Sequence, residues 1–174
     1  MAIENDGKKF NQYLEPTSHI SKDSSRITGL TINGLDLCRN GRVIDDTMEP
    51  QEGIKRFISW IEMEFPGGCI LVAHNGKRFD FPILKRYLES SSLSFRSLHG
   101  LDSREIFKKH FPDLAKNKME SLVSEFLPNK ECKHHDALED AQNLSAVIKK
   151  ASKQKGMGLS EFLHVQGKSY YRLI

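Results

Sequence analysis

Residues 69–84 read CILVAHNGKRFDFPIL. Cys69 to Ala73 form a short, wholly apolar run after the turn Pro66-Gly67-Gly68, which is typical of a buried strand in a parallel sheet. His74-Asn75-Gly76 is the exit from that strand. A helix is expected from about Phe81 to Leu88, with Pro82 tolerated in its first turn. The stretch therefore predicts a strand that passes directly into a helix.

Strands and helices also alternate on both sides of this stretch. The N-terminus predicts a hairpin, because the turn signal Asn5-Asp6-Gly7 separates Ala2–Glu4 from a returning strand at Lys9–Leu14. We expect loop and short helix over Ser21–Gly34, a second strand within Leu93–Leu101, and helices over Glu52–Phe65, Arg104–Phe111, Lys118–Leu127 and Asp136–Ser152. Asp102-Ser103 is a candidate cap for the helix at Arg104–Phe111. This alternation indicates an α/β layer fold. We assign residues 1–152 to one domain and leave residues 153–174 as a tail of unknown role.

Composition places the chain among ordinary globular proteins. It has 174 residues, 38% hydrophobic and 28% charged, with a net charge of +3 that permits nucleic-acid binding without requiring it. Its 3 cysteines form no CxxC pair, which argues against a disulfide framework. The start of the chain lacks the pattern of a signal peptide, and no apolar run is long enough for a membrane span. We expect an intracellular protein, nuclear or cytoplasmic.

Asp140 lies against the pattern of the last predicted helix. At 100° per residue, it falls inside the apolar stripe that contains Ala137, Leu144, Val147 and Ile148. A carboxylate that faces a core needs a cation or hydrogen-bond donors. Either a capping or salt-bridged role or a functional role satisfies this need.

Two other polar residues sit at helix entrances. Asp80 lies where the chain passes from the strand at Cys69–Ala73 into a helix, and ligands of α/β sheets bind at such strand ends. It is equally an N-cap candidate, because it precedes Pro82 and Asp is favoured there. His135 begins the last helix, beside His134. It is either an incidental loop histidine or a general base that takes a proton from water.

Two segments together resemble the DEDDh family of 3′-to-5′ exonucleases. Residues 71–84 (LVAHNGKRFDFPIL) resemble its second motif, and residues 135–141 (HDALEDA) resemble its third, a His and an Asp with four residues between them. Residues 25–31 resemble the block that abuts the 3′-terminal nucleotide. The likeness is greatest to three-prime repair exonucleases and covers roughly residues 8–150. It implies a ribonuclease-H-like mixed sheet flanked by helices, and removal of nucleotides from 3′ ends with two Mg²⁺ or Mn²⁺ ions.

The resemblance also implies roles for individual residues. Asp80 and Asp140 would be the metal-linked carboxylates, and His135 the base that activates water. Phe79 would pack on the terminal nucleotide, although a core aromatic is the alternative. Ile27 would wedge against the terminal bases, or simply be buried. Further nucleic-acid contacts would come from Thr28, Gly29, Asn75 and Arg78, although Asn75-Gly76 is also a plain turn signal.

The family's first motif, an Asp-x-Glu on the opening strand, has no clean copy here. Its nearest candidate is Ala2-Ile3-Glu4, with Ala where Asp is expected. We align Ala2–Leu14 instead with the second strand, turn and third strand of the family fold. The first strand, which lies between the second strand and the one at Cys69–Ala73, is then missing, and a metal site would have about half its anionic ligands.

Three functions compete on this evidence. The first is an exonuclease that acts on single-stranded or frayed nucleic acid, DNA before RNA, with a homodimer possible by resemblance. The second is a truncated or catalytically inactive module that binds nucleic acid or a protein partner. The third is a zinc-stabilised relative that uses Glu131, Cys132 and His134 or His135, which the single nearby cysteine disfavours.

Overall fold

The computed structural model describes residues 2–91, 98–114, 118–130, 136–164 and 170–173. The chain begins with an antiparallel hairpin of β1 (Ala2–Asn5) and β2 (Lys8–Asn11). Asp6 and Gly7 have φ values of 49° and 85°, which matches the turn that twisted hairpins prefer. The predicted N-terminal hairpin is therefore present, and β3 (Tyr13–Leu14) follows it and pairs in parallel with β7 (Thr47–Met48).

The central sheet contains β8 (Ile70–Ala73), β9 (His99–Asp102) and β10 (Tyr170–Arg172). β8 runs parallel to β9, as the apolar run predicted, and β10 lies antiparallel on the other side of β9. β8 was also expected to be buried, but Ile70 is 50% exposed. The tail to which the sequence assigned no role thus contributes a strand. The second strand, expected within Leu93–Leu101, is present as β9, which ends at Asp102, and residues 93–97 of that range lie outside the described residues.

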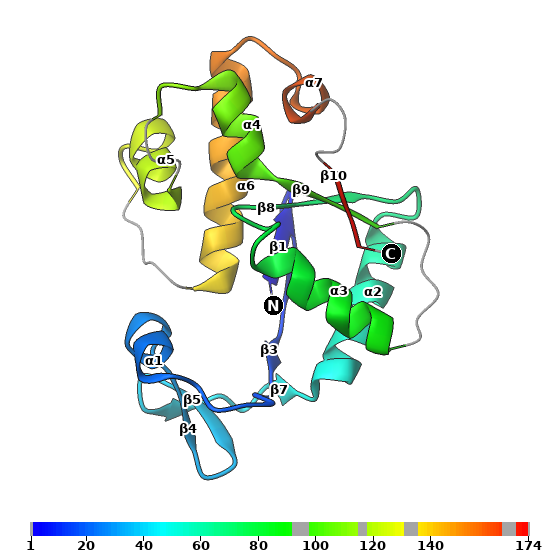
Figure 1. The fold of residues 1–174 in the computed structure, drawn as a ribbon, viewed down its shortest axis with the longest axis vertical. Coiled ribbons are helices and arrows are strands. Elements are labelled where there is room, and N and C mark those ends of the chain that lie inside the picture. Colours follow the sequence, from blue (N-terminus) through cyan, green and yellow to red (C-terminus); the bar gives the residue numbers. More distant parts are fainter. Residues whose placement is uncertain (1, 92–97, 115–117, 131–135, 165–169, 174) are drawn as a thin grey trace.

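Helices cover both faces of this sheet (Figure 1). One apolar cluster joins α2 (Pro50–Glu64) and α3 (Asp80–Ser90) to Leu71 of β8. The other joins α4 (Ser103–His110), α5 (Met119–Phe126), α6 (Ala137–Gln154) and α7 (Leu159–Leu163) to Val72 and Leu101. Successive residues of β8 face opposite clusters because strand side chains alternate between the two faces. The predicted α/β fold is confirmed.

An open cavity of about 790 Å³ lies between the N-terminal hairpin and the central sheet. It is lined by Asn5 of β1, by Ile70 to Val72 of β8, and by the α6 residues Ala141, Leu144, Ser145 and Ile148. Among the described residues, β1 pairs only with β2, and β8 pairs only with β9. In the part of the chain that the structure describes, the two strands that the resemblance puts on either side of the family's first strand are therefore not paired with each other.

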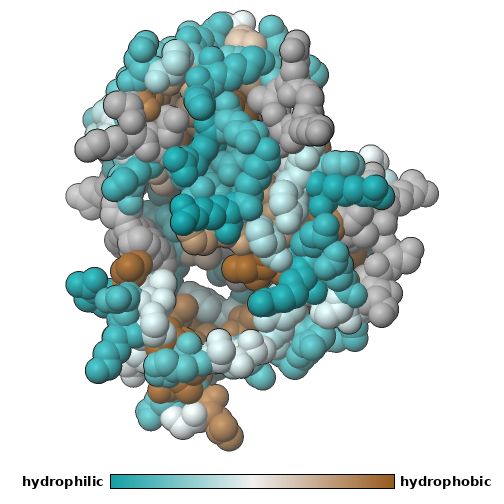
Figure 2. All heavy atoms as spheres, in the orientation of Figure 1, coloured by the Kyte–Doolittle hydropathy of each residue, from teal (hydrophilic) through white to brown (hydrophobic). Residues whose placement is uncertain are grey.

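A separate small unit, here called the α1 unit, comprises α1 (Lys22–Thr28) and the strands β4 (Leu30–Asn33), β5 (Asp36–Arg39) and β6 (Arg42–Val43). The short helix was expected, but the three antiparallel strands were not. The unit carries apolar side chains that are at least 40% exposed, namely Ile27, Ile32, Leu35 and Val43. Figure 2 shows hydrophobic atoms gathered over this lower part of the molecule.

Candidate active site

The loop that leaves β8 is held in place by one buried carboxylate. Asp102, at the end of β9, is only 5% exposed. Its Oδ1 accepts the backbone N–H of Asn75 at 3.0 Å, and its Oδ2 accepts that of Lys77 at 3.1 Å. Oδ1 also accepts the N–H of Arg104 at 3.0 Å, which caps α4 as the sequence predicted. The same carboxylate therefore fixes both the start of α4 and the strand-to-helix loop.

Side chains form a second set of polar contacts between this loop and α4. The Arg104 guanidinium donates to Oδ1 of Asn75 at 3.0 Å. Lys77 Nζ lies 2.7 Å from Oε1 of Glu105, and His74 Nδ1 lies 2.9 Å from the Ser103 hydroxyl. Asn75 has a φ of 61°, a conformation that Asn tolerates better than most residues. The turn interpretation of Asn75-Gly76 is correct, and the Asn75 side chain is engaged within the protein.

Phe81 anchors the helix that follows the loop. Its ring is 2% exposed and lies against two glycines, Gly76 and Gly100. A Cβ placed on either glycine would come within 2.8 Å of the ring, so only glycine permits this close approach. Tyr171 of β10 packs on Phe81 with ring centroids 5.6 Å apart. Because Asp80 precedes Phe81, this packing also sets the position of the Asp80 backbone.

Asp80 is the first residue of α3, and the N-cap position belongs to Phe79, which makes no side-chain cap bond. The N-cap interpretation of Asp80 is therefore wrong. Asp80 remains exposed. The pKa of its carboxyl is nevertheless raised, first because surrounding protein partly desolvates it and second because the Asp102 carboxylate repels its charge. A cation at this position would relieve both effects.

Phe79 and Ile27 present apolar surface to solvent, being 54% and 49% exposed. The alternative that these two residues are buried in the core is wrong. Arg78 is also exposed, and its guanidinium lies 5.7 Å from the centre of the Phe79 ring. An exposed aromatic ring beside a cation is a suitable surface for stacking an unpaired base.

Ile27, Thr28 and Gly29 form the C-terminal end of α1. Gly29 is its C-cap with a φ of 71°, and a Cβ there would lie 2.2 Å from Oδ1 of Asn40. The Thr28 hydroxyl donates to the Ser24 carbonyl and accepts the Leu30 N–H at 3.1 Å. Among these three residues, Ile27 therefore offers the most accessible side chain.

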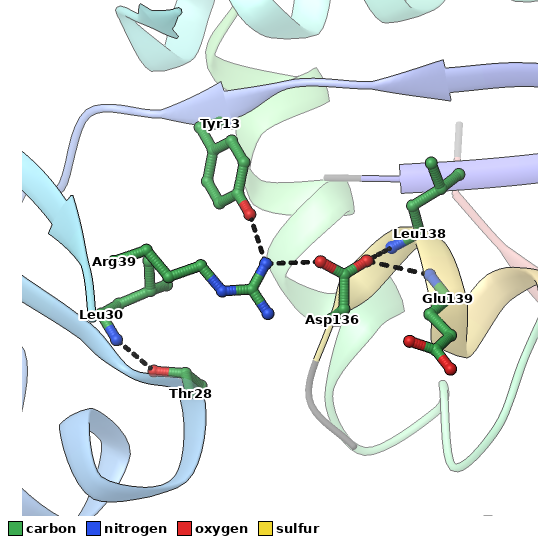
Figure 3. Close-up of polar contacts among 7 residues, drawn as sticks. All are labelled: Tyr13, Thr28, Leu30, Arg39, Asp136, Leu138 and Glu139. Atoms are coloured by element: carbon green, nitrogen blue, oxygen red, sulfur yellow. Dashed lines mark hydrogen bonds and ion pairs between the residues drawn. The ribbon is translucent and has the colours of Figure 1, made fainter. Parts of the chain in front are cut away.

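Asp140 lies in the first turns of α6, on the same side of the helix as the buried residues Asn143, Leu144 and Val147. It is partly buried, as the helical pattern predicted, and it takes part in polar contacts. The helix is capped by Asp136, whose Oδ1 accepts the N–H groups of Leu138 and Glu139 at 3.1 and 3.0 Å (Figure 3). The capping role thus belongs to Asp136 and not to Asp140.

The acidic side chains are of the type that binds a divalent cation, but too few of the described ones gather in one place. Carboxylate oxygens are the ligands that Mg²⁺ and Mn²⁺ prefer. In the described part of the chain, however, no three His, Cys, Asp or Glu side chains gather closely enough to hold a metal ion. The structure brings Asp80 and Asp102 within electrostatic reach of each other, but Asp102 is committed to backbone N–H groups. His135, Glu131, Cys132 and His134 lie outside the described residues.

Comparison with known proteins identifies the family. A family model described as "Exonuclease" (RNase_T) matches residues 2–148. The chain belongs to this exonuclease family. The family prediction made from residues 71–84 and 135–141 is thereby confirmed. Membership supports a nucleic-acid hydrolase, and exonucleases of this family generally use divalent metal ions.

Individual relatives agree with the family model. The exonuclease-family chain is 32% identical over 148 residues to "Exonuclease DPD1, chloroplastic/mitochondrial" of Arabidopsis thaliana, covering 79% of the chain and 45% of the relative. It is 27% identical over 140 residues to "DNA polymerase III PolC-type" of Clostridium perfringens, covering 80% of the chain and 8% of the polymerase. The chain thus spans less than half of each of these relatives.

The sequence missed two parts of this site. Asp102 was expected to cap α4, but its hold on the loop at Asn75–Lys77 joins residues far apart in the sequence. Arg39, which contacts Asp136, carried no sequence signal at all.

None of the helices among the described residues is long and apolar enough to cross a membrane.

Proposed function

We propose that this chain hydrolyses phosphodiester bonds from the 3′ end of single-stranded or frayed nucleic acid, with DNA preferred to RNA, in a reaction that needs Mg²⁺ or Mn²⁺. The observation that carries the proposal is membership of the exonuclease family across residues 2–148. Two features of the fold support it. Asp80 sits at the crossover from β8 to α3, and Asp140 sits on the inner side of α6.

The residues divide into two groups in this proposal. Asp80 and Asp140 supply negative charge to divalent cations, which stabilise the charge that develops on the phosphate. The raised pKa of Asp80 is consistent with a carboxyl that is held ready for a cation. His135, one residue before the cap of α6, is proposed as the base that takes a proton from the attacking water.

The substrate side of the site uses the exposed apolar residues. Phe79, beside Arg78, offers a ring face on which the terminal base stacks, and Ile27 offers an edge against which the next base rests. Thr28, Gly29 and Asn75 would contribute mainly through the backbone shape they impose. An exonuclease that enters at a free end needs such stacking surfaces in place of base-specific contacts.

A second function is a module that binds nucleic acid without cleaving it. It is favoured by the shortage of acidic ligands among the described residues and by the cavity between β1 and β8. The two functions differ in one property, because cleavage depends on metal and on Asp140, whereas stacking on Phe79 depends on neither.

The test is digestion of a 5′-labelled single-stranded DNA oligonucleotide, with the matching RNA alongside, in Mg²⁺, Mn²⁺ or EDTA. We expect a ladder of products shortened from the 3′ end, present with metal and absent with EDTA. Asp80→Asn and Asp140→Asn should remove it, and His135→Ala should slow it by about 10²–10⁴-fold. Asp113→Asn, at an exposed carboxylate in the loop after α4, is the matched control and should cleave normally.

Oligonucleotide affinity measured in EDTA separates the alternatives. Tight binding without any ladder from folded wild-type chain would reject the exonuclease and support the binding module. A ladder that survives Asp140→Asn would reject the assigned site while keeping the activity.

A further inference from the structure

Arg39 connects three parts of the chain that are distant in sequence. From the end of β5, its Nη1 donates to the Tyr13 hydroxyl at 2.8 Å and also pairs with Oδ2 of Asp136 (Figure 3). The Arg39 and Asp136 side chains are 29% and 32% exposed, so water only partly screens the ion pair. We call this arrangement the Arg39 bridge. It ties the α1 unit to β3 and to the start of α6.

At one end, the Arg39 bridge holds the first turn of α6. While Oδ2 of Asp136 pairs with Arg39, Oδ1 caps the helix through Leu138 and Glu139. The backbone N–H of Asp140 donates to the carbonyl of Asp136 at 2.8 Å. Asp136 thus contacts both Arg39, through its side chain, and the backbone of Asp140, through its carbonyl. Asp136 is also adjacent in sequence to His135.

At its other end, the bridge holds the segment with the exposed Ile27. Arg39 faces Leu30 in the β4–β5 ladder, and the Leu30 N–H donates to the Thr28 hydroxyl. The next residue, Asn40, donates its backbone N–H to the Gly29 carbonyl at 2.8 Å. The end of α1 and the start of α6 are therefore linked through one guanidinium.

We propose that Arg39 is a positioning residue that fixes the end of α1, which carries the proposed substrate contact of Ile27, relative to the turn of α6 that carries Asp140. This inference rests on the proposed function. Because the guanidinium is planar and rigid, the contacts of its Nη1 with a carboxylate and a phenol restrict direction as well as distance, which a freely rotating ammonium does not. The precision matters because a misplacement of about 1 Å lowers the rate of an enzyme by about 100-fold.

The kinetic test compares variants that remove the ion pair with one that leaves it. Arg39→Gln removes the charge, and Asp136→Asn removes the other charge while its amide oxygen still caps α6. Each should lower kcat at least about tenfold and leave KM within about threefold. The double variant should be little worse than either single one, because both remove the same contact. Arg39→Lys should recover part of the loss, since it keeps the charge.

The matched control is Arg42→Gln, at the exposed cross-strand neighbour of Arg39 in β6. It makes the same charge change in the same unit and should leave kcat unchanged. A loss confined to KM, an equal loss in Arg42→Gln, or losses that add fully in the double variant would each overturn the proposal.

A readout without catalysis separates this proposal from the proposed function. Amide hydrogen exchange of Leu138 and Glu139, followed by NMR, should be several times faster in Arg39→Gln than in wild type or Arg42→Gln. If wild-type chain yields no ladder, the proposed function fails, and exchange alone decides whether Arg39 positions α6. Unchanged exchange at both amides would overturn the positioning role.

Discussion

Replacing Gly100 by alanine tests whether the packing of Phe81 holds the site together. The added Cβ would lie 2.7 to 2.8 Å from three atoms of the Phe81 ring, where ordinary contact begins at 3.4 Å. The ring or β9 must therefore shift by about 0.7 Å. The ring has little room to move, because it is 2% exposed and Gly76 lies as close to it.

The expected change in the free energy of unfolding follows from two opposing effects. Overpacking a core costs about 1–3 kcal/mol, whereas replacing glycine by alanine lowers the entropy of the unfolded chain and returns about 0.4–1 kcal/mol. Gly100 has no positive φ, so alanine adds no backbone strain. We expect a net loss of about 0–2.6 kcal/mol in the free energy of unfolding, centred near about 1 kcal/mol, and a Tm lower by about 2–4 °C for each kcal/mol lost.

The assay is urea denaturation of Gly100→Ala beside wild type, with Gly67→Ala as the control. Gly67 also lacks a positive φ, and nothing lies within 4 Å of the point that an added Cβ would occupy there, so its alanine variant should match wild type or exceed it. Phe81→Leu combined with Gly100→Ala should be more stable than the sum of the two single losses predicts. A Gly100→Ala chain as stable as Gly67→Ala would refute the packing argument.

Three further predictions concern charge and surface. The Arg39 guanidinium holds the pKa of Asp136 below its ordinary 3.8, so the bridge stabilises the fold above that pH and is lost as pH falls through the lowered pKa. Wild type and Asp136→Asn should therefore differ in unfolding free energy at pH 6, and the difference should shrink as pH falls below 3.8. Burial lowers the pKa of His110 below 6.5, so stability should decline as pH drops below 6.5, and His110→Gln should remove that decline in denaturation midpoints taken between pH 7.5 and 5.5. Phe79→Ala should weaken binding of single-stranded DNA in EDTA by about 1–3 kcal/mol in fluorescence anisotropy, and unchanged affinity would count against stacking on that ring.

The parts of the fold that were predictable are those whose structure is determined by residues close together in the sequence. In the run at Cys69–Ala73, Leu71 and Val72 pack against helices on opposite faces of β8, whereas Ile70 is 50% exposed. The position of Asp140 followed from the helical period, since α6 buries one side from Asn143 to Ser152 and Asp140 continues that side. In both cases neighbouring residues determine the environment, so sequence spacing was sufficient.

The α1 unit was missed because its strands bury too little to show alternation. In β4, Leu30 is partly buried and the next three residues are exposed, so no period of two appears. The signals that were available are Asn33-Gly34 and Asn40-Gly41, both typical of tight hairpin turns, and Gly34, Asn40 and Gly41 do have positive φ values. Turn chemistry was a better guide here than hydrophobic patterning.

The geometry of the site depends on contacts that no local rule can supply. Asp102 illustrates the point, because a capping rule finds its bond to Arg104 two residues away but not its bonds to Asn75 and Lys77 in another crossover. Those bonds exist only because β8 and β9 are parallel neighbours, which brings their carboxyl ends to one edge. A carboxylate at that edge must be assigned by its partners. Asp102 accepts backbone N–H groups and holds the loop, whereas Asp80 is exposed, has a raised pKa and is the carboxylate that we propose as a cation ligand.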